Sequence, residues 1–208
     1  MTDLQAATAA SPAADLPPAP PTRAAVMRAA THDLHEALDA RMMAADLFSS
    51  RERYALFLSL QRRFHAEIAP LYRDPPLKAL IPDLAERGKL DEIDRDFSDI
   101  GLAPAAGDTI PVDPSDTAAG LGWLYVAEGS SLGAAFLLKA AKAIGLDEQF
   151  GARHLAAHPE GRGLAWRRFV DALNAASLSP ADDARAEAAA VAAFGRVRAI
   201  AEETLAKG

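Results

Sequence analysis

The chain has no cysteine among its 208 residues. This absence excludes disulfides, iron–sulfur clusters, thiolate metal sites and a cysteine nucleophile. Aromatic residues are also few, whereas half of the residues are apolar and alanine is abundant. This combination indicates helices that pack through small side chains, with enough apolar surface to form a sizeable core.

An excess of positive charge and a long apolar run are missing as well. The formal net charge of −7 argues against nucleic acid or an anionic membrane surface as the main partner. No apolar run reaches the roughly 18 residues expected of a membrane span. The N-terminus also lacks a basic start followed by an apolar segment, as a secretory signal would have. We therefore expect a soluble, cytoplasmic protein.

The chain divides into a short tail and one domain. Residues 1–22 are rich in alanine and proline without hydrophobic periodicity, and we expect them to be disordered or extended. No internal repeat and no second linker follows. We therefore expect a single domain over residues 23–208.

Hydrophobic periodicity predicts an all-α fold of six to eight helices, because no stretch alternates as a strand would. Ser49 and Glu52 stand at capping-box spacing at the start of one of these helices. The expected helical segments are 23–45, 49–72, 77–99 with an interruption near Gly88, about 114–116 to 145, 164–177 and 181–206. Residues 101–114 and 151–163 contain the glycines and prolines typical of connections.

Two histidines lie in the first predicted helix, in the segment ATHDLHEALD. His35 precedes Leu38 by three residues and Met42 by seven, so it borders the apolar stripe. It could turn an imidazole nitrogen across the core, or it could be a half-buried histidine bonded to a neighbour. His32 lies nearer the charged side, where we expect it to be solvated.

The other three histidines give no clear metal signature. His65 lies among charged residues, which predicts a polar face. His154 and His158 are four apart, but Pro159 indicates that no helix continues there, so we expect a pair of loop histidines. No glutamate is followed three residues later by histidine, as a di-iron bundle would require.

The segment YVAEGSSLGAAFL, residues 125–137, places Gly129 and Gly133 inside a predicted helix. Each glycine costs about 1 kcal/mol relative to alanine, so close approach of another group is expected there. That group could be a packed helix or a flat ligand. Ser130 and Ser131 could hold water or bond to helix carbonyls and bend the helix. The letters GSSLG also match a nucleophile elbow, but a strand does not precede them.

Several basic residues could bind carboxylates or could simply be surface charges. Arg28 precedes His35 by seven residues and therefore shares nearly the same helical face. Lys139 and Lys142 follow the glycine segment, and Arg167 and Arg168 lie in a later predicted helix.

Together, the motif A-T-x-x-L-H at residues 30–35 and the segment YVAEGSSLGAAFL resemble the haem oxygenases, in particular the bacterial biliverdin-producing branch. The resemblance covers most of residues 23–205. It implies a single all-α domain in which haem lies between a proximal helix and a kinked distal helix. It also implies that His35 is the axial iron ligand and that Gly129 and Gly133 are distal glycines that let the backbone cover the haem face.

The resemblance further implies roles for three residues and leaves one in question. Arg28 matches a basic position that faces a haem propionate, and Tyr125 and Phe194 match aromatic positions near the haem. Ser130 occupies a position where animal-type relatives carry an aspartate that organises distal water. Ser130, Ser131 and backbone carbonyls are the candidates to hold water in its place.

The implied activity is conversion of haem to biliverdin, carbon monoxide and ferrous iron, with dioxygen and external electrons. Haem is both cofactor and substrate, and the electron donor would be a reductase or a ferredoxin. A bacterial phytochrome could accept the biliverdin, which could also be a product of iron acquisition. Two alternatives stay open: a haem carrier of the same fold without catalysis, and an unrelated helical interaction protein in which the glycines pack helix on helix.

Overall fold

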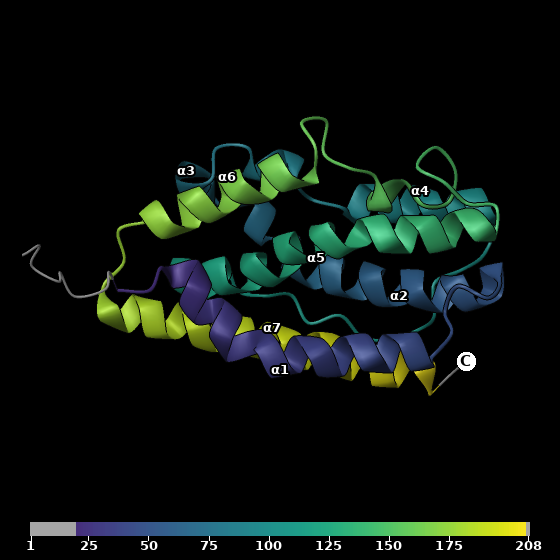
Figure 1. The fold of residues 1–208 in the computed structure, drawn as a ribbon, viewed down its shortest axis with the longest axis horizontal. Coiled ribbons are helices and arrows are strands. Elements are labelled where there is room, and N and C mark those ends of the chain that lie inside the picture. Colours follow the sequence, from purple (N-terminus) through teal and green to yellow (C-terminus); the bar gives the residue numbers. More distant parts are fainter. Residues whose placement is uncertain (1–19, 207–208) are drawn as a thin grey trace, which may run out of the picture.

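The computed structural model describes residues 20–206, which form an all-α structure (Figure 1). The α-helices are α1 Arg23–Ala44, α2 Arg51–Ile68, α3 Pro75–Leu80, α4 Leu90–Ile100, α5 Thr117–Ala143, α6 Arg162–Ala175 and α7 Pro180–Leu205. Three short 3-10 turns lie between them: η1 Leu71–Arg73, η2 Leu84–Glu86 and η3 Arg153–Leu155. The predicted all-α fold and the expected number of helices are confirmed over the described residues. Most of the predicted tail, residues 1–19, lies outside them.

Side chains at the helix starts explain where the helices begin. The Thr22 and Asp116 side chains accept hydrogen bonds from the first turns of α1 and α5, as N-caps do. For α2 the capping residue is Ser50, whose hydroxyl accepts from the Arg53 amide at 3.2 Å. The predicted cap at Ser49 is therefore wrong by one residue.

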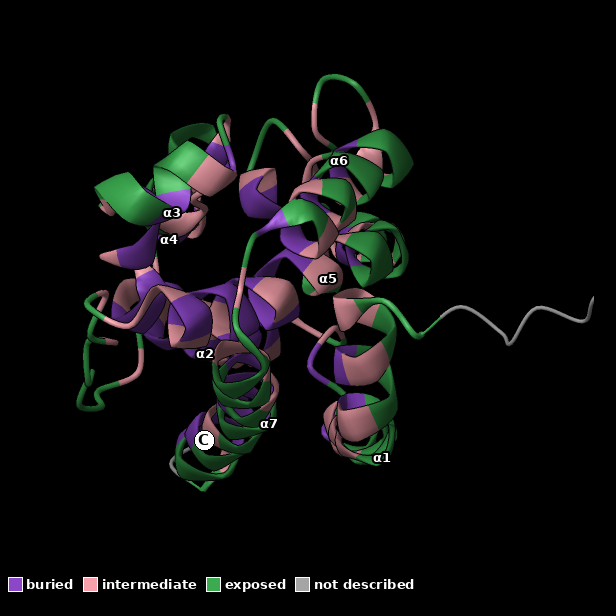
Figure 2. Cartoon of the chain, turned by 90° about the vertical axis from the view of Figure 1, so that its left-hand side faces the viewer, coloured by how far each residue is buried: buried purple, intermediate pink, exposed green. Residues whose placement is uncertain are grey.

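The helices pack in layers around α5. In Figure 1, α1 and α7 lie along one edge of the molecule, α2 and α5 in the middle, and α3, α4 and α6 along the other edge. Seen end-on in Figure 2, α6 lies above α5 and α1 lies below it, with exposed residues on the outer faces. The helix α5 packs against α6 and α7, and α1 packs against the same two helices. The two helices α1 and α5 therefore share neighbours on one side of the molecule.

Small residues bring α5 and α7 together. A Cβ added at Gly122 would lie 2.1 Å from the carbonyl oxygen of Ala186 on α7, which no native contact allows. A Cβ added at Gly120 would lie 2.9 Å from the Leu77 side chain. The alanine-rich composition of α7 serves the same close packing, since Ala186, Ala190 and other alanines of this helix are fully buried.

By length and composition alone, α5 is apolar enough to cross a membrane, and this qualifies the expectation that no such segment exists. Core helices of globular proteins meet the same criterion. The helix contacts α2, α3, α6 and α7 and carries a buried ion pair in its middle, through Glu128. Its remaining apolar exposure is confined largely to one face, which is described next.

Candidate functional site

His35 projects from α1 with its side chain 60% exposed. Its Nδ1 atom lies 3.1 Å from the carboxylate of Asp39, one turn further along the helix. The ring meets Phe194 of α7 edge-on, with centroids 5.8 Å apart. A carboxylate on one ring nitrogen fixes the orientation of an imidazole and leaves Nε2 available as a metal ligand. Among the predicted site residues, the structure thus brings His35 and Phe194 together.

His32 has a similar carboxylate neighbour but a different setting. Its Nε2 atom lies 3.4 Å from Glu36, and its side chain is 63% exposed, as expected for a solvated residue. His32, Asp33 and Glu36 lie close enough together to form an exposed cluster of potential ligands.

A stripe of α5 that is exposed from Leu132 to Phe136 carries the predicted glycines. Tyr125, Gly129, Leu132, Gly133 and Phe136 follow one another at helical spacing, so they lie on one face. Leu132 is 43% exposed and Phe136 is 85% exposed, which is unusual for large apolar side chains of a long core helix. The described protein thus leaves the second half of this stripe uncovered.

The first residue of the stripe, Tyr125, lies within electrostatic reach of α1. Burial raises the pKa of Tyr125, and the guanidinium of Arg28 on α1 opposes that rise. Tyr125 also contacts Trp166 of α6, with ring centroids 5.6 Å apart. Figures 1 and 2 both show α1 near α5.

Gly129 and Gly133 are not packing glycines. A Cβ at Gly129 would make only an ordinary contact of 3.6 Å with Trp166, and a Cβ at Gly133 would have nothing within 4 Å. The close helix packing that the sequence left open as an explanation instead involves Gly120 and Gly122. Nothing in the described fold therefore requires glycine at position 133.

Both serines between these glycines bond back to the helix, as the sequence suggested they could. The Ser130 hydroxyl donates to the carbonyl of Ala127 at 2.7 Å, and the Ser131 hydroxyl donates to the carbonyl of Glu128 at 2.6 Å. Such bonds tend to bend a helix without ending it. The helix α5 indeed continues through both glycines to Ala143.

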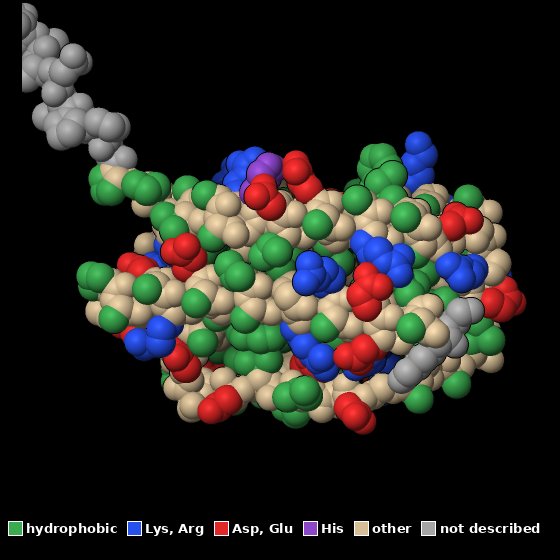
Figure 3. All heavy atoms as spheres, turned by 90° about the horizontal axis from the view of Figure 1, so that it is seen from below, with side chains coloured by type: hydrophobic (Ala, Val, Ile, Leu, Met, Phe, Trp, Pro, Cys, Tyr) green, Lys and Arg blue, Asp and Glu red, His purple; other side chains and the backbone are tan. Residues whose placement is uncertain are grey.

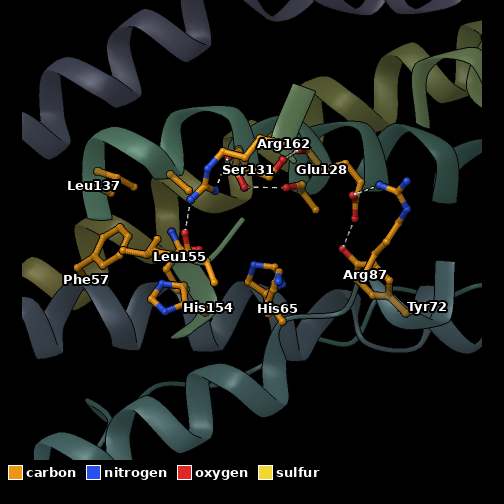
Figure 4. A pocket seen from close by; sticks show the side chains of 16 residues that line it. Phe57, His65, Tyr72, Arg87, Glu128, Ser131, Leu137, His154, Leu155 and Arg162 are labelled. Atoms are coloured by element: carbon orange, nitrogen blue, oxygen red, sulfur yellow. Dashed lines mark hydrogen bonds and ion pairs between the residues drawn. The ribbon is translucent and has the colours of Figure 1, made fainter. Parts of the chain in front are cut away.

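A small polar cavity of about 70 Å³ lies on the other side of α5 from α1 (Figure 4). Two buried ring nitrogens in its lining, His65 Nδ1 and His154 Nε2, have no protein partner. The carboxylate of Asp96 fixes the orientation of the His154 ring. It is fully buried and lies 2.7 Å from Nδ1 of that ring. A polar cavity of this size with unsatisfied groups is suited to ordered water.

Burial keeps both cavity histidines neutral at pH 7. It lowers the pKa of His65 to about 3, with smaller contributions from His154 and Lys89. It also lowers the pKa of His154, although Asp96 opposes that change. The prediction that His65 lies on a polar face is therefore wrong. His154 lies in the short turn η3 of the predicted connection, where its side chain is buried, and no helix joins it to His158.

A buried ion pair that the sequence did not reveal holds α5 just before Gly129. The Glu128 carboxylate accepts from Arg87 at 2.8 Å and from the Tyr72 hydroxyl at 3.1 Å. Arg87 also donates to Asp83 and to the carbonyl of Ala165. Burial raises the pKa of Glu128, and Arg87 offsets part of that rise.

Of the remaining basic candidates, two are already paired and two are exposed. Lys142 lies 2.9 Å from Glu148, and Arg168 pairs with Glu160. Lys139 and Arg167 are exposed. In the view of Figure 3, acidic and basic side chains are interspersed without one large patch of a single sign.

These features define a class of protein: an all-α domain that presents an oriented histidine beside an uncovered, glycine-containing helix face. The match to the family model described as heme oxygenase spans residues 22–203. The chain is 39% identical over 177 residues to heme oxygenase PigA of Pseudomonas aeruginosa, covering 85% of this chain and 89% of that protein. This chain therefore belongs to the heme oxygenase family.

A solved structure supports the same assignment. The NO- and CO-bound heme oxygenase of Neisseria meningitidis matches this structure with a TM-score of 0.84 at 39% identity. The match covers 89% of this chain and 92% of the other chain. Fold, family and sequence likeness thus agree over nearly the whole described region.

Proposed function

We propose that this protein is a haem-degrading monooxygenase that converts haem to biliverdin, carbon monoxide and ferrous iron with dioxygen and external electrons. The observation that supports it most is the uncovered apolar stripe of α5 beside His35, in a chain of the heme oxygenase family. Haem fits these residues because a flat apolar ligand would cover the stripe at the glycines, where no side chain projects. When bound, haem supplies the iron that activates dioxygen.

The protein's first task is to hold the iron and to exclude water. His35 would supply Nε2 as the axial ligand, with Asp39 fixing the ring through Nδ1. Gly129 and Gly133 would lie against the opposite face of haem and leave space only for a small molecule such as dioxygen. Phe194, which already contacts the His35 ring, would fill the space beside it.

The second task is to orient haem within its plane. Figure 1 shows α1 and α5 running in the same direction, so the two helices have matching ends. Arg28 and Tyr125 supply charge and a hydroxyl at one end, whereas Met43 and Phe136 are exposed and apolar towards the other. Haem has one edge with two carboxylates and one apolar edge. We therefore place the propionates at Arg28 and Tyr125.

Protons for the reaction would come through the polar cavity behind α5. The unpartnered Nε2 of His154 and Nδ1 of His65 can each bond to water there. The serine hydroxyls of residues 130 and 131 lie between that cavity and the glycine surface. This arrangement would replace the aspartate that some relatives use.

The test is to incubate the purified protein with haem, a reductant and oxygen. We expect bilin absorption and release of carbon monoxide. A stable haem complex without turnover would instead identify a carrier, and failure to bind haem would favour a helical interaction protein. The exposed His35 can be replaced by alanine at little cost in stability. His35→Ala should change the haem spectrum while His32→Ala, one turn away, should leave it unchanged.

The partners and location follow from this activity. We propose that a reductase or a ferredoxin delivers the electrons, and that the protein acts in the cytoplasm without a membrane partner. The biliverdin could pass to a bacterial phytochrome, or its formation could serve iron acquisition. We also propose one domain from Arg23 to residue 208, since Thr22 already caps the first helix.

A further inference from the structure

Arg162 ties the middle of α5 to a neighbouring loop. It is the first residue of α6, and its guanidinium donates to the carbonyl of Ser131 on α5 at 3.0 Å. A second donor of the same group bonds to the carbonyl of Leu155, at the end of η3. Figure 4 shows the guanidinium between these two carbonyls, beside the cavity. The contacts join segments 31 and 7 residues away in sequence.

The position of Arg162 within α6 is unfavourable for the helix itself. The N-terminus of a helix carries partial positive charge, and cations there are destabilising. The first turn of α6 contains no acidic residue, and Gly161 provides no side-chain cap. Burial also lowers the pKa of Arg162. Helix stability therefore gives no reason for an arginine at this position, whereas the contact with Ser131 does.

The carbonyl that Arg162 holds lies midway between Gly129 and Gly133. Between residues 127 and 131, three carbonyl acceptors carry an extra donor: Ser130 bonds to residue 127, Ser131 to residue 128, and Arg162 to residue 131. Extra donors draw carbonyls away from the helix axis and bend the helix. The flanking glycines have no Cβ to stiffen the backbone against this pull.

We propose that Arg162 is a positioning residue, which holds the Ser131 carbonyl and thereby sets the shape of the Gly129–Gly133 surface that lies against haem. The proposal rests on the proposed function, because it assigns the surface to haem. Under this proposal, the two arginines that contact α5 have different roles. Arg87 anchors the Glu128 side chain in the core, and Arg162 acts directly on the backbone between the two glycines.

The experiment compares Arg162→Met and Arg162→Lys with Arg167→Met. Arg167 lies on the same helix, is exposed and loses the same charge, so it serves as the matched control. In the haem-free proteins, amide hydrogen exchange is measured over residues 132–137. In the haem complexes, we measure haem affinity, the absorption and electron paramagnetic resonance spectra of the ferric form, and kcat and KM.

We expect Arg162→Met to speed exchange of these amides about tenfold, since the local opening of α5 becomes easier. The spin state of the ferric complex should change and kcat should fall about tenfold, while haem affinity stays within about threefold. Arg162→Lys can keep one of the two bonds and should fall between methionine and wild type. Arg167→Met should match wild type in every measurement.

A merely structural role predicts a different pattern. If Arg162→Met lowers the melting temperature but keeps the wild-type spectra and kcat, the proposal is overturned. Wild-type exchange in residues 132–137 would overturn it as well, and that measurement does not require haem. If the wild-type protein neither binds nor degrades haem, the proposed function fails, and the assignment of the surface to haem fails with it.

Discussion

Replacing Gly133 with alanine should stabilise the haem-free protein and weaken its binding of haem. Gly133 lies in the interior of α5, is exposed, and has open space where a Cβ would stand. Alanine is more favourable than glycine at such a helical position by about 0.8–1 kcal/mol. For a chain of this length, that gain corresponds to a rise of about 2–4 °C in the melting temperature.

Haem affinity should change in the opposite direction, because the new side chain occupies the surface that we propose for haem. Gly133→Leu sharpens this test, since leucine is also a good helix former but projects much further. We expect the Kd of Gly133→Leu for haem to rise about tenfold or more, which corresponds to ~1.4 kcal/mol. A gain in stability together with a loss of binding is the signature of a position reserved for a ligand.

Thermal unfolding of the haem-free proteins and titration with haem followed by absorbance measure the two effects. Gly163→Ala is the control for binding: it lies on α6, has open space at its Cβ, and should leave haem affinity unchanged. Gly122→Ala is the control for stability and should destabilise, because of the short contact with Ala186. Wild-type haem affinity in Gly133→Leu would refute the placement of haem on α5. A lower melting temperature in Gly133→Ala would contradict the conclusion that a Cβ at position 133 meets no other atom.

Three further predictions address charged and titrating groups. Arg28→Met should weaken haem binding by about 1 kcal/mol, or roughly fivefold in Kd, because an exposed charge pair contributes little more. The melting temperature should not change. An unchanged Kd in a haem titration would argue against a propionate at Arg28. Arg87→Met should cost about 3–5 kcal/mol in urea unfolding by leaving Glu128 buried without its partner. The double variant with Glu128→Met should recover part of that loss, and no recovery would contradict the ion-pair explanation. For His65, whose folded pKa is about 3, the unfolded chain takes up a proton below its ordinary pKa of about 6.5 while the folded chain does not. The buried His65 therefore destabilises the folded protein more and more as the pH falls from about 6.5 towards 3. The His65→Gln variant should lose less stability than wild type between pH 7 and 4. Parallel profiles of stability against pH for the two proteins would contradict this.

The helices could be predicted because their signals are local. Periodicity and caps involve residues three or four apart, and all the predicted helical segments appear with ends shifted by a few residues. The largest difference is at the end of α2, which stops at Ile68 and is followed by the short turn η1 rather than running on to Tyr72.

The error at His65 shows what local patterns cannot reveal. Two of its charged neighbours in sequence, Arg63 and Glu67, are buried too, because each has a distant partner. Glu67 binds Arg196, 129 residues later, and Arg63 binds Glu203, 140 residues later. A charged neighbourhood thus marks an interior ion-pair network here, where the sequence alone suggested a solvated face.

The glycines of α5 likewise show what the sequence alone could not reveal about the site. In sequence, Gly120 and Gly122 look no more constrained than Gly129 and Gly133. Only the packing separates the pair that must meet Leu77 and α7 from the pair with open space. For the same reason Arg162 and Arg87 escaped notice, since their contacts with α5 depend on how separate helices meet.

The exposed apolar side chains of α1 and α5 make self-association of this protein depend on its substrate. Met43 and Phe136, 83% and 85% exposed, are the two most accessible large apolar side chains in the described region. Uncovered surfaces of this kind promote self-association. A ligand that shields them also shifts the folding equilibrium towards the native state by mass action. In the placement that we propose, haem covers these side chains and is also consumed by the reaction. When haem is scarce, copies of this chain should therefore associate with one another.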